Sequence, residues 1–267
     1  MNKLNLPFPQ TKLAFAISLV LLAFMPVQAQ PVKPVIVVQH LPFNSIRQLS
    51  FNAPEPPDDI NAPGDRIGGG KRGCEDMDKQ LTGSKEKQLT ALVPIYGSPD
   101  SGLVLGVTTV EHPTFWFYVP YSRTLSVSFI LQDEAEQLVY ETSVSLSGTP
   151  GIVSFSLPST SPMLAIGKQY HWYFNVNCQE QQPPVFVNGW IKREELNTTL
   201  KSQLEKATPK QRVAIYAANG IWHEALTASA ELSRIDAKRT DWGALLQAVG
   251  LDDIAKEPIV ECCQPKD

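Results

Sequence analysis

The sequence predicts an α+β protein, in which an immunoglobulin-like or fibronectin-like antiparallel β-sandwich precedes a packed C-terminal region of about three helices. Three observations support this fold class. One segment, residues 164–178, carries large apolar residues at every second position. Seven or eight short segments of strand character lie between residues 86 and 193, with turn residues between them. From Glu194 onward the apolar period changes to that of a helix.

The segment 164–178 predicts the central strand of the sandwich. Because side chains alternate between the two faces of a strand, its large residues share one face. The residues expected to point into the core are Tyr170, Trp172, Phe174, Val176 and Cys178. Leu164 and Gly167 precede Tyr170 with the spacing of a tyrosine corner, which closes one turn of immunoglobulin-like folds.

The other expected strands flank this one in the sequence. They are Leu89–Pro94, Leu103–Thr109, Pro113–Val119, Thr124–Gln132, Leu138–Leu146, Ile152–Leu157 and Val185–Arg193. Pro113–Val119 has aromatic residues on both faces, which predicts that both of its faces are covered. Thr124–Gln132 alternates apolar residues mostly with serine, which is typical of a strand with one solvated face.

Helix signals follow the last strand. Leu196, Leu200 and Leu204 lie at helical spacing, and Thr208-Pro209 with Gln211 forms a capping-box start. Further helices are expected from Trp222 and from near Asp241. Because no linker separates strands from helices, we expect the helices to pack on the sandwich, with Tyr173 or Trp190 at the seam.

The N-terminal part of the chain predicts export. Residues 1–29 have the basic start, apolar stretch and small-residue cleavage site of a signal peptide. Residues 30–85 form a Pro- and Gly-rich, largely irregular leader, residues 86–193 the sandwich, and residues 194–267 the helical region with a short tail. No later segment is long and apolar enough to span a bilayer, so we expect a protein of the periplasm or cell surface.

The charge of the chain argues against a nucleic-acid partner. The formal charge is −4, and loss of Lys3 and Lys12 with the signal peptide would bring it to −6. An acidic protein of this kind lacks the basic surface that binds phosphate backbones.

Four cysteines, an even number in an exported chain, predict disulfide bonding. The preferred pairing joins Cys74 to Cys178 and leaves Cys262 and Cys263 as a strained adjacent pair, as two free thiols or as intermolecular partners. The alternative is that all four thiols are unpaired. No cysteine or histidine spacing fits a zinc site, and no metal or cofactor is expected.

The sequence contains no recognisable catalytic set. Its histidines are scattered outside any triad or metal pattern: His40, His112, His171 and His223. No nucleophile-elbow motif is present. Its acidic cluster of Asp133, Glu134 and Glu136 is expected to be a solvated hairpin turn rather than a pair of glycosidase carboxylates. No residue is therefore predicted to be catalytic.

Trp116 and Tyr118 are the candidate binding residues. They lie on the second aromatic face of their strand, where paired rings can stack against sugar rings or partner side chains. The alternative is that they form the seam with the helices or the leader.

Several longer motifs can be compared with known families. They are Leu89-Thr90-Ala91-Leu92-Val93-Pro94, Pro113-Thr114-Phe115-Trp116-Phe117-Tyr118-Val119-Pro120-Tyr121, Leu131-Gln132-Asp133-Glu134, Thr149-Pro150-Gly151-Ile152-Val153-Ser154, Tyr170-His171-Trp172-Tyr173-Phe174, Gly189-Trp190-Ile191 and Asn219-Gly220-Ile221-Trp222. Through these motifs most of residues 66–263 resembles the cyanobacterial family named domain of unknown function (DUF) 928. The resemblance implies an exported protein with no assigned activity, catalytic residue or cofactor.

These observations favour an exported, non-enzymatic binding or scaffold protein of the cell envelope, whose partner would be an envelope protein or glycan. The alternative is a hydrolase of envelope polysaccharide or peptide. Its site would be assembled only in the fold, from acidic residues with His171 or His112.

Overall fold

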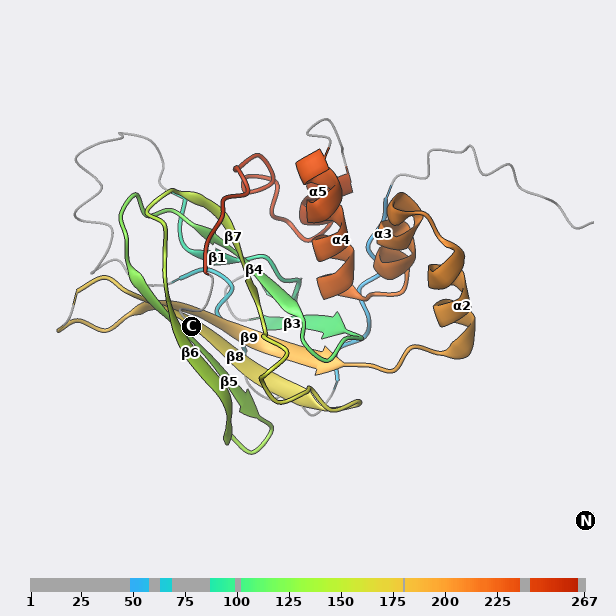
Figure 1. The fold of residues 1–267 in the computed structure, drawn as a ribbon, viewed down its shortest axis with the longest axis horizontal. Helices are drawn as coiled ribbons and strands as arrows, with labels where there is room; N and C mark the ends of the chain where they lie inside the picture. The colour runs from blue at the N-terminus through green and yellow to red at the C-terminus, as the bar shows by residue number, and fades with distance from the viewer. Residues whose placement is uncertain are drawn as a thin grey trace, which may run out of the picture. The chain divides into compact units, whose positions relative to one another are not determined.

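The computed structural model describes residues 49–57, 63–68, 87–98, 102–179, 181–235 and 241–263. These residues belong to one compact unit, Ile46–Asp267. They form two β-sheets and four helices (Figure 1). The strands are β1 (Thr90–Ala91), β2 (Ile95–Tyr96), β3 (Leu103–Thr108), β4 (Thr114–Val119), β5 (Ser126–Asp133), β6 (Leu138–Ser145), β7 (Gly151–Ser156), β8 (Gln169–Asn177) and β9 (Val185–Arg193). The helices are α2 (Thr198–Lys206), α3 (Pro209–Ala218), α4 (Trp222–Ile235) and α5 (Asp241–Ala248).

The two sheets differ in size and in strand direction. The small sheet has the order β1-β4-β7 and is antiparallel, whereas the large sheet has the order β2-β3-β9-β8-β5-β6. In the large sheet β3 and β9 run parallel, so the prediction of a wholly antiparallel sandwich was wrong at this pair. The chain leaves β3, crosses to the small sheet and returns, and such a crossover allows two strands to lie parallel.

The main hydrophobic core lies between the two sheets. Trp172 and Phe174 of β8 are fully buried against Phe115 and Phe117 of β4, and the rings of Phe117 and Phe174 stack with centroids 3.9 Å apart. At the start of β8 the backbone N–H of Ala165 donates a hydrogen bond to the Tyr170 hydroxyl (2.9 Å). This is the bond that a tyrosine corner makes.

The second core lies between the small sheet and the helices. Trp116 and Tyr118 point away from the inter-sheet core, and Trp116 packs edge-on against Trp242 of α5, with ring centroids 5.6 Å apart. The indole N–H of Trp222 in α4 donates to the Leu92 carbonyl (2.8 Å). The small sheet is therefore covered on both faces, as the aromatic residues of residues 113–119 predicted.

The seam between sandwich and helices differs from the expected one. His171 and Tyr173 alternate with the inward-facing Trp172 of β8, which places them on the opposite face of the large sheet. Trp190 stacks on His171 with ring centroids 4.5 Å apart. The expectation that Tyr173 or Trp190 forms the seam was therefore wrong, because the helices pack on the small sheet instead.

The helical region contains four helices rather than about three. The helical spacing of Leu196, Leu200 and Leu204 belongs to a separate helix, α2, which is capped by Asn197 and buries Leu200 and Leu204. Helix α3 begins with the expected capping box at Thr208 and ends at Asn219, after which Gly220 adopts a φ of 71°. This turn folds α3 back against α4, so the two helices form a hairpin (Figure 1).

Segments outside the regular elements complete the fold. Residues 63–68 connect the sheets, because Asp65 accepts a hydrogen bond from the backbone of Asn188 in β9 and Arg66 accepts one from Ala91 in β1. Near the C-terminus, the backbone N–H of Val260 donates to the carbonyl of Ile152 in β7.

The predicted signal peptide, most of the leader, His40 and Cys74 lie outside the described residues. Within the described ranges, the helices are all too short or too polar to cross a bilayer.

Candidate functional site

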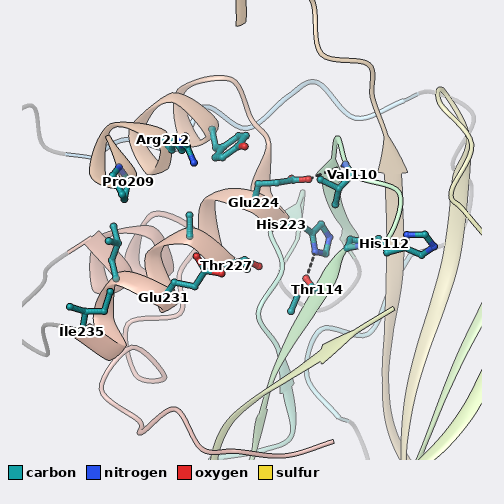
Figure 2. Close-up of a pocket in the computed structure, with 14 residues that line it drawn as sticks. Val110, His112, Thr114, Pro209, Arg212, His223, Glu224, Thr227, Glu231 and Ile235 are labelled. Atoms are coloured by element: carbon teal, nitrogen blue, oxygen red, sulfur yellow. Dashed lines mark hydrogen bonds between the residues drawn. The ribbon is translucent and has the colours of Figure 1, made fainter. Parts of the chain in front are cut away.

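A groove lies between the α3–α4 hairpin and the segment that joins β3 to β4 (Figure 2). Its volume is about 430 Å³, within the range of small-ligand sites. Most of the surface exposed in the groove is apolar, and its apolar lining residues are Val110, Pro113, Pro209, Ala228, Leu232 and Ile235. The polar lining residues are His112, Thr114, Arg212, Tyr216, His223, Glu224, Thr227 and Glu231.

His223 lies at the inner end of the groove and is almost completely buried. Its Nδ1–H donates to the Thr114 carbonyl of β4 (3.0 Å), and its ring meets Phe115 edge-on. The other ring nitrogen, Nε2, has no hydrogen-bond partner among the described residues. Burial lowers the pKa of His223 from 6.5 to about 4, partly opposed by the bond to Thr114, so the ring is neutral at pH 7.

Gly106 of β3 makes the room for this ring. A Cβ at this position would lie 2.4 Å from Nε2 of His223. The close approach of α4 to β3 therefore depends on the missing side chain.

Glu224 connects the same end of α4 to the segment after β3. Its Oε1 accepts hydrogen bonds from the Thr108 hydroxyl (2.7 Å) and from the backbone N–H groups of Thr109 (2.9 Å) and Val110 (3.1 Å). Its Oε2 is buried and has no hydrogen-bond partner among the described residues. Burial raises the pKa of Glu224 above 4.5, although these hydrogen bonds oppose the rise.

The groove is open to solvent both beside Glu224 and at the end of α4. Ile235, at the end of α4, is 84% exposed and Val110 is 41% exposed. Arg212 and Glu231 are exposed on facing helices, and Arg212 donates from Nε to the Leu204 carbonyl at the end of α2 (3.1 Å). The groove thus combines an apolar surface with two carboxylates and one guanidinium.

The predicted binding residues do not line this groove. Trp116 is 3% exposed and Tyr118 is 5% exposed, both in the seam with the helices. The Trp116 indole N–H donates to the hydroxyl of Thr227 (3.0 Å), a groove residue, so this buried ring holds part of the groove lining in place. Their proposed stacking on a sugar ring is not supported, because rings buried to this extent present no face to a ligand.

The two histidines of the hydrolase alternative are hydrogen-bonded to other residues, and only His112 lines the groove. His112 is hydrogen-bonded through Nε2 to the Ser161 carbonyl (3.1 Å). His171 bonds Asn188 through Nε2 and the Tyr173 hydroxyl through Nδ1, both at 2.9 Å, on the far face of the large sheet. Burial lowers its pKa, with Asn188 and the charge of Glu136 opposing the change. Both nitrogens of His171 are thus occupied, which leaves neither ready to accept a substrate proton.

The acidic cluster lies where the sequence placed it, in the hairpin between β5 and β6. Asp133 accepts hydrogen bonds from the backbone of Ala135 and Gln137 (both 2.9 Å). Glu134 accepts from Lys168 and from the Gln169 backbone (both 3.1 Å). These carboxylates therefore stabilise the hairpin and its contact with the start of β8. In the part of the chain that is described, no three His, Cys, Asp or Glu side chains gather as metal ligands would.

The three described cysteines lie in two places, near the C-terminus and directly after β8. The sulfur atoms of Cys262 and Cys263 are bonded in the structure, which corresponds to the adjacent pair among the alternatives. Cys178 follows β8 and is packed against the inter-sheet core. Its predicted pairing with Cys74 stays a prediction, because Cys74 lies outside the described residues.

Sequence reasoning missed the groove. His223 and Glu224 form an ionisable pair at the start of an otherwise apolar helix face, which is a weak signal in the sequence. Their hydrogen-bond partners lie more than 100 residues earlier in the chain, so only the fold reveals the site.

Comparison with protein families gives one match. Residues 67–259 match the family described as Domain of Unknown Function (DUF928). The chain belongs to the DUF928 family. The matched residues include both sheets, all four helices and every residue that lines the groove, so the groove lies wholly within the DUF928 domain. No curated protein and no solved structure matches the chain.

Proposed function

We propose that this DUF928 protein is an exported, non-enzymatic binding or scaffold protein of the cell envelope, and that the groove is its binding site. The observation that carries the proposal is the combination of an apolar groove with a buried carboxylate oxygen, Oε2 of Glu224, that has no partner among the described residues. Leaving a buried acceptor unpaired costs roughly 1–3 kcal/mol. Because Oε2 has almost no exposed surface, a ligand donor reaches it only when the carboxylate shifts toward the groove, and a donor that does so recovers that cost.

The rigidity of the groove supports a binding role. Its inner end is fixed by the five hydrogen bonds of Glu224 and His223 to residues 108–114. A preformed site loses little entropy when a ligand binds. The proposed compartment rests on the signal peptide predicted for residues 1–29, and an immunoglobulin-like arrangement of the two sheets remains a proposal as well.

The test compares partner capture by groove variants. Ala228→Trp places a large side chain in the middle of the groove, whereas Ala214→Trp places the same side chain on the exposed face of α3. Each purified protein is immobilised and incubated with envelope extract, and bound proteins and glycans are identified by mass spectrometry. We expect a partner that binds wild type and Ala214→Trp but not Ala228→Trp. Identical profiles for all three proteins would contradict the proposed site.

A further inference from the structure

We propose that the groove binds an extended apolar peptide segment that carries one basic side chain, with the lysine or arginine paired with the carboxylate of Glu231. This inference rests on the proposed function and names the class of ligand for the same site. Three features of the groove support it: the balance of its charges, the spacing of its side chains along α4, and its open ends.

The charge balance favours a cationic ligand. The charged side chains that line the groove are Glu224, Glu231 and Arg212. Arg212 is directed by its Nε bond toward the end of α2. Neither carboxylate has a cationic partner among the described residues. A basic group in the groove would pair with the exposed carboxylate of Glu231, while the buried carboxylate of Glu224 adds a second negative charge at longer range.

The spacing along α4 fits a short extended segment. Glu224, Ala228, Glu231 and Ile235 follow one another at intervals of three or four residues, so they form one stripe on the helix. Two helical turns separate the two glutamates, which is about 11 Å. From Glu224 to Ile235 the stripe extends about 16 Å, the length of roughly five extended residues. The small side chain of Ala228 leaves space between the carboxylates for the stem of a basic side chain.

The open ends favour a chain over an enclosed small molecule. Val110 at one end and Ile235 at the other are exposed apolar side chains, so the apolar surface continues out of the groove in both directions. A polypeptide can extend past both ends and cover these residues. The aliphatic residues on either side of its basic residue would then contact Leu232 and Pro113.

The probe is a fluorescein-labelled heptapeptide, Ser-Leu-Val-Lys-Val-Leu-Ser, compared with versions that have Gln or Glu in place of Lys. Binding to the whole protein is followed by fluorescence anisotropy. We expect the Lys peptide to bind about threefold more tightly than the Gln peptide, a preference typical of an exposed charge pair, and the Glu peptide to bind weakest. Glu231→Gln should reduce the preference for Lys, whereas Glu205→Gln, on the exposed face of α2, should leave it unchanged.

The outcomes separate this inference from the proposed function. Equal binding of the Lys and Gln peptides, or a Lys preference that survives in Glu231→Gln, overturns the charge assignment. If Ala228→Trp nevertheless abolishes the binding, the groove remains a binding site. Absence of peptide binding to wild type overturns the peptide assignment, and the capture experiment then decides on the proposed function by itself.

Discussion

His223 is a histidine whose environment excludes its charged form. Its ring is buried, its Nδ1–H is committed to the Thr114 carbonyl, and the space around Nε2 is closed by Gly106. At Nε2, no described acceptor lies within hydrogen-bonding distance to stabilise an imidazolium. The neutral ring therefore packs as part of the core between α4 and the small sheet.

This burial predicts how stability depends on pH. The unfolded chain binds a proton at His223 below pH 6.5, whereas the folded protein binds one only below about 4. Stability should therefore be lost as the pH falls from about 6.5 to 4, and this histidine contributes up to about 3 kcal/mol of the loss. Urea unfolding of wild type and His223→Asn at pH 7 and pH 4.5 measures the effect, and we expect a smaller difference in the variant.

Glu224 provides a test of the opposite sign. Its pKa is raised in the folded protein, so the folded state binds the extra proton and gains stability as the pH falls. Glu224→Gln removes this gain and should make the loss of stability at low pH steeper than in wild type. If His223→Asn and Glu224→Gln changed the pH dependence in the same direction, the assignment of these two groups would be incorrect. His171, whose pKa is also lowered, is present in every protein of the series and does not affect the comparison.

At the level of elements, the contact between β3 and α4 determines the position of the groove. Gly106 allows the ring of His223 to approach the strand, and Glu224 binds the end of β3 and the residues after it. These contacts connect a strand of the large sheet to a helix that covers the small sheet. The groove depends on them, because its inner wall is the segment that they hold.

Gly106→Ala should disturb this contact. The added methyl group would overlap Nε2 of His223, so we expect a loss of about 1–3 kcal/mol in the free energy of unfolding. When Gly106→Ala is introduced into the His223→Ala variant, the additional loss should be much smaller, because the alanine at 223 leaves room for the methyl group. Gly243→Ala in α5, where nothing lies within 4 Å of the added Cβ, is the control and should be neutral or stabilising by up to about 1 kcal/mol. An equal loss with and without the histidine would refute the proposed overlap.

The elements themselves were largely predictable, because their signals are local. The alternation around Trp172 gave a strand with one buried face, and Thr208 with Gln211 gave the start of α3. The strand pairings were not predictable to the same extent. The parallel pair β3–β9 joins residues about 85 positions apart, and period-two patterns contain no information on which strands become neighbours.

The candidate site was even less predictable. The sequence drew attention to Trp116 because a strand with aromatic residues on both faces must have both faces buried. It does not show whether a ligand or a helix buries the second face. Apart from the hydroxyls of Thr108 and Thr109, the partners of Glu224 and His223 are backbone groups of residues 109–114, which any residue type could supply. A site whose partners are largely backbone atoms leaves little trace in the composition of the chain.

At the scale of the whole molecule, the described residues form three layers, with the small sheet between the large sheet and the helices. The small sheet contributes Phe115 and Phe117 to the core with the large sheet, and Trp116 and Tyr118 to the core with the helices. Because alternate residues of a single strand belong to the two cores, disturbing β4 affects both. The sandwich and the helical region should therefore unfold together, as one cooperative unit.

Trp116→Ala tests this coupling. The substitution removes a buried indole, its contact with Trp242 and its hydrogen bond to Thr227, so we expect a loss of about 3–5 kcal/mol. Phe186→Ala, which truncates an exposed side chain on the large sheet, is the control and should cost much less. Thermal unfolding is followed by far-ultraviolet circular dichroism for the helices and by near-ultraviolet signals for the aromatic core. The two transitions should coincide in wild type and shift together in Trp116→Ala, since a helical region that melted separately would mean that the small sheet does not couple the two layers.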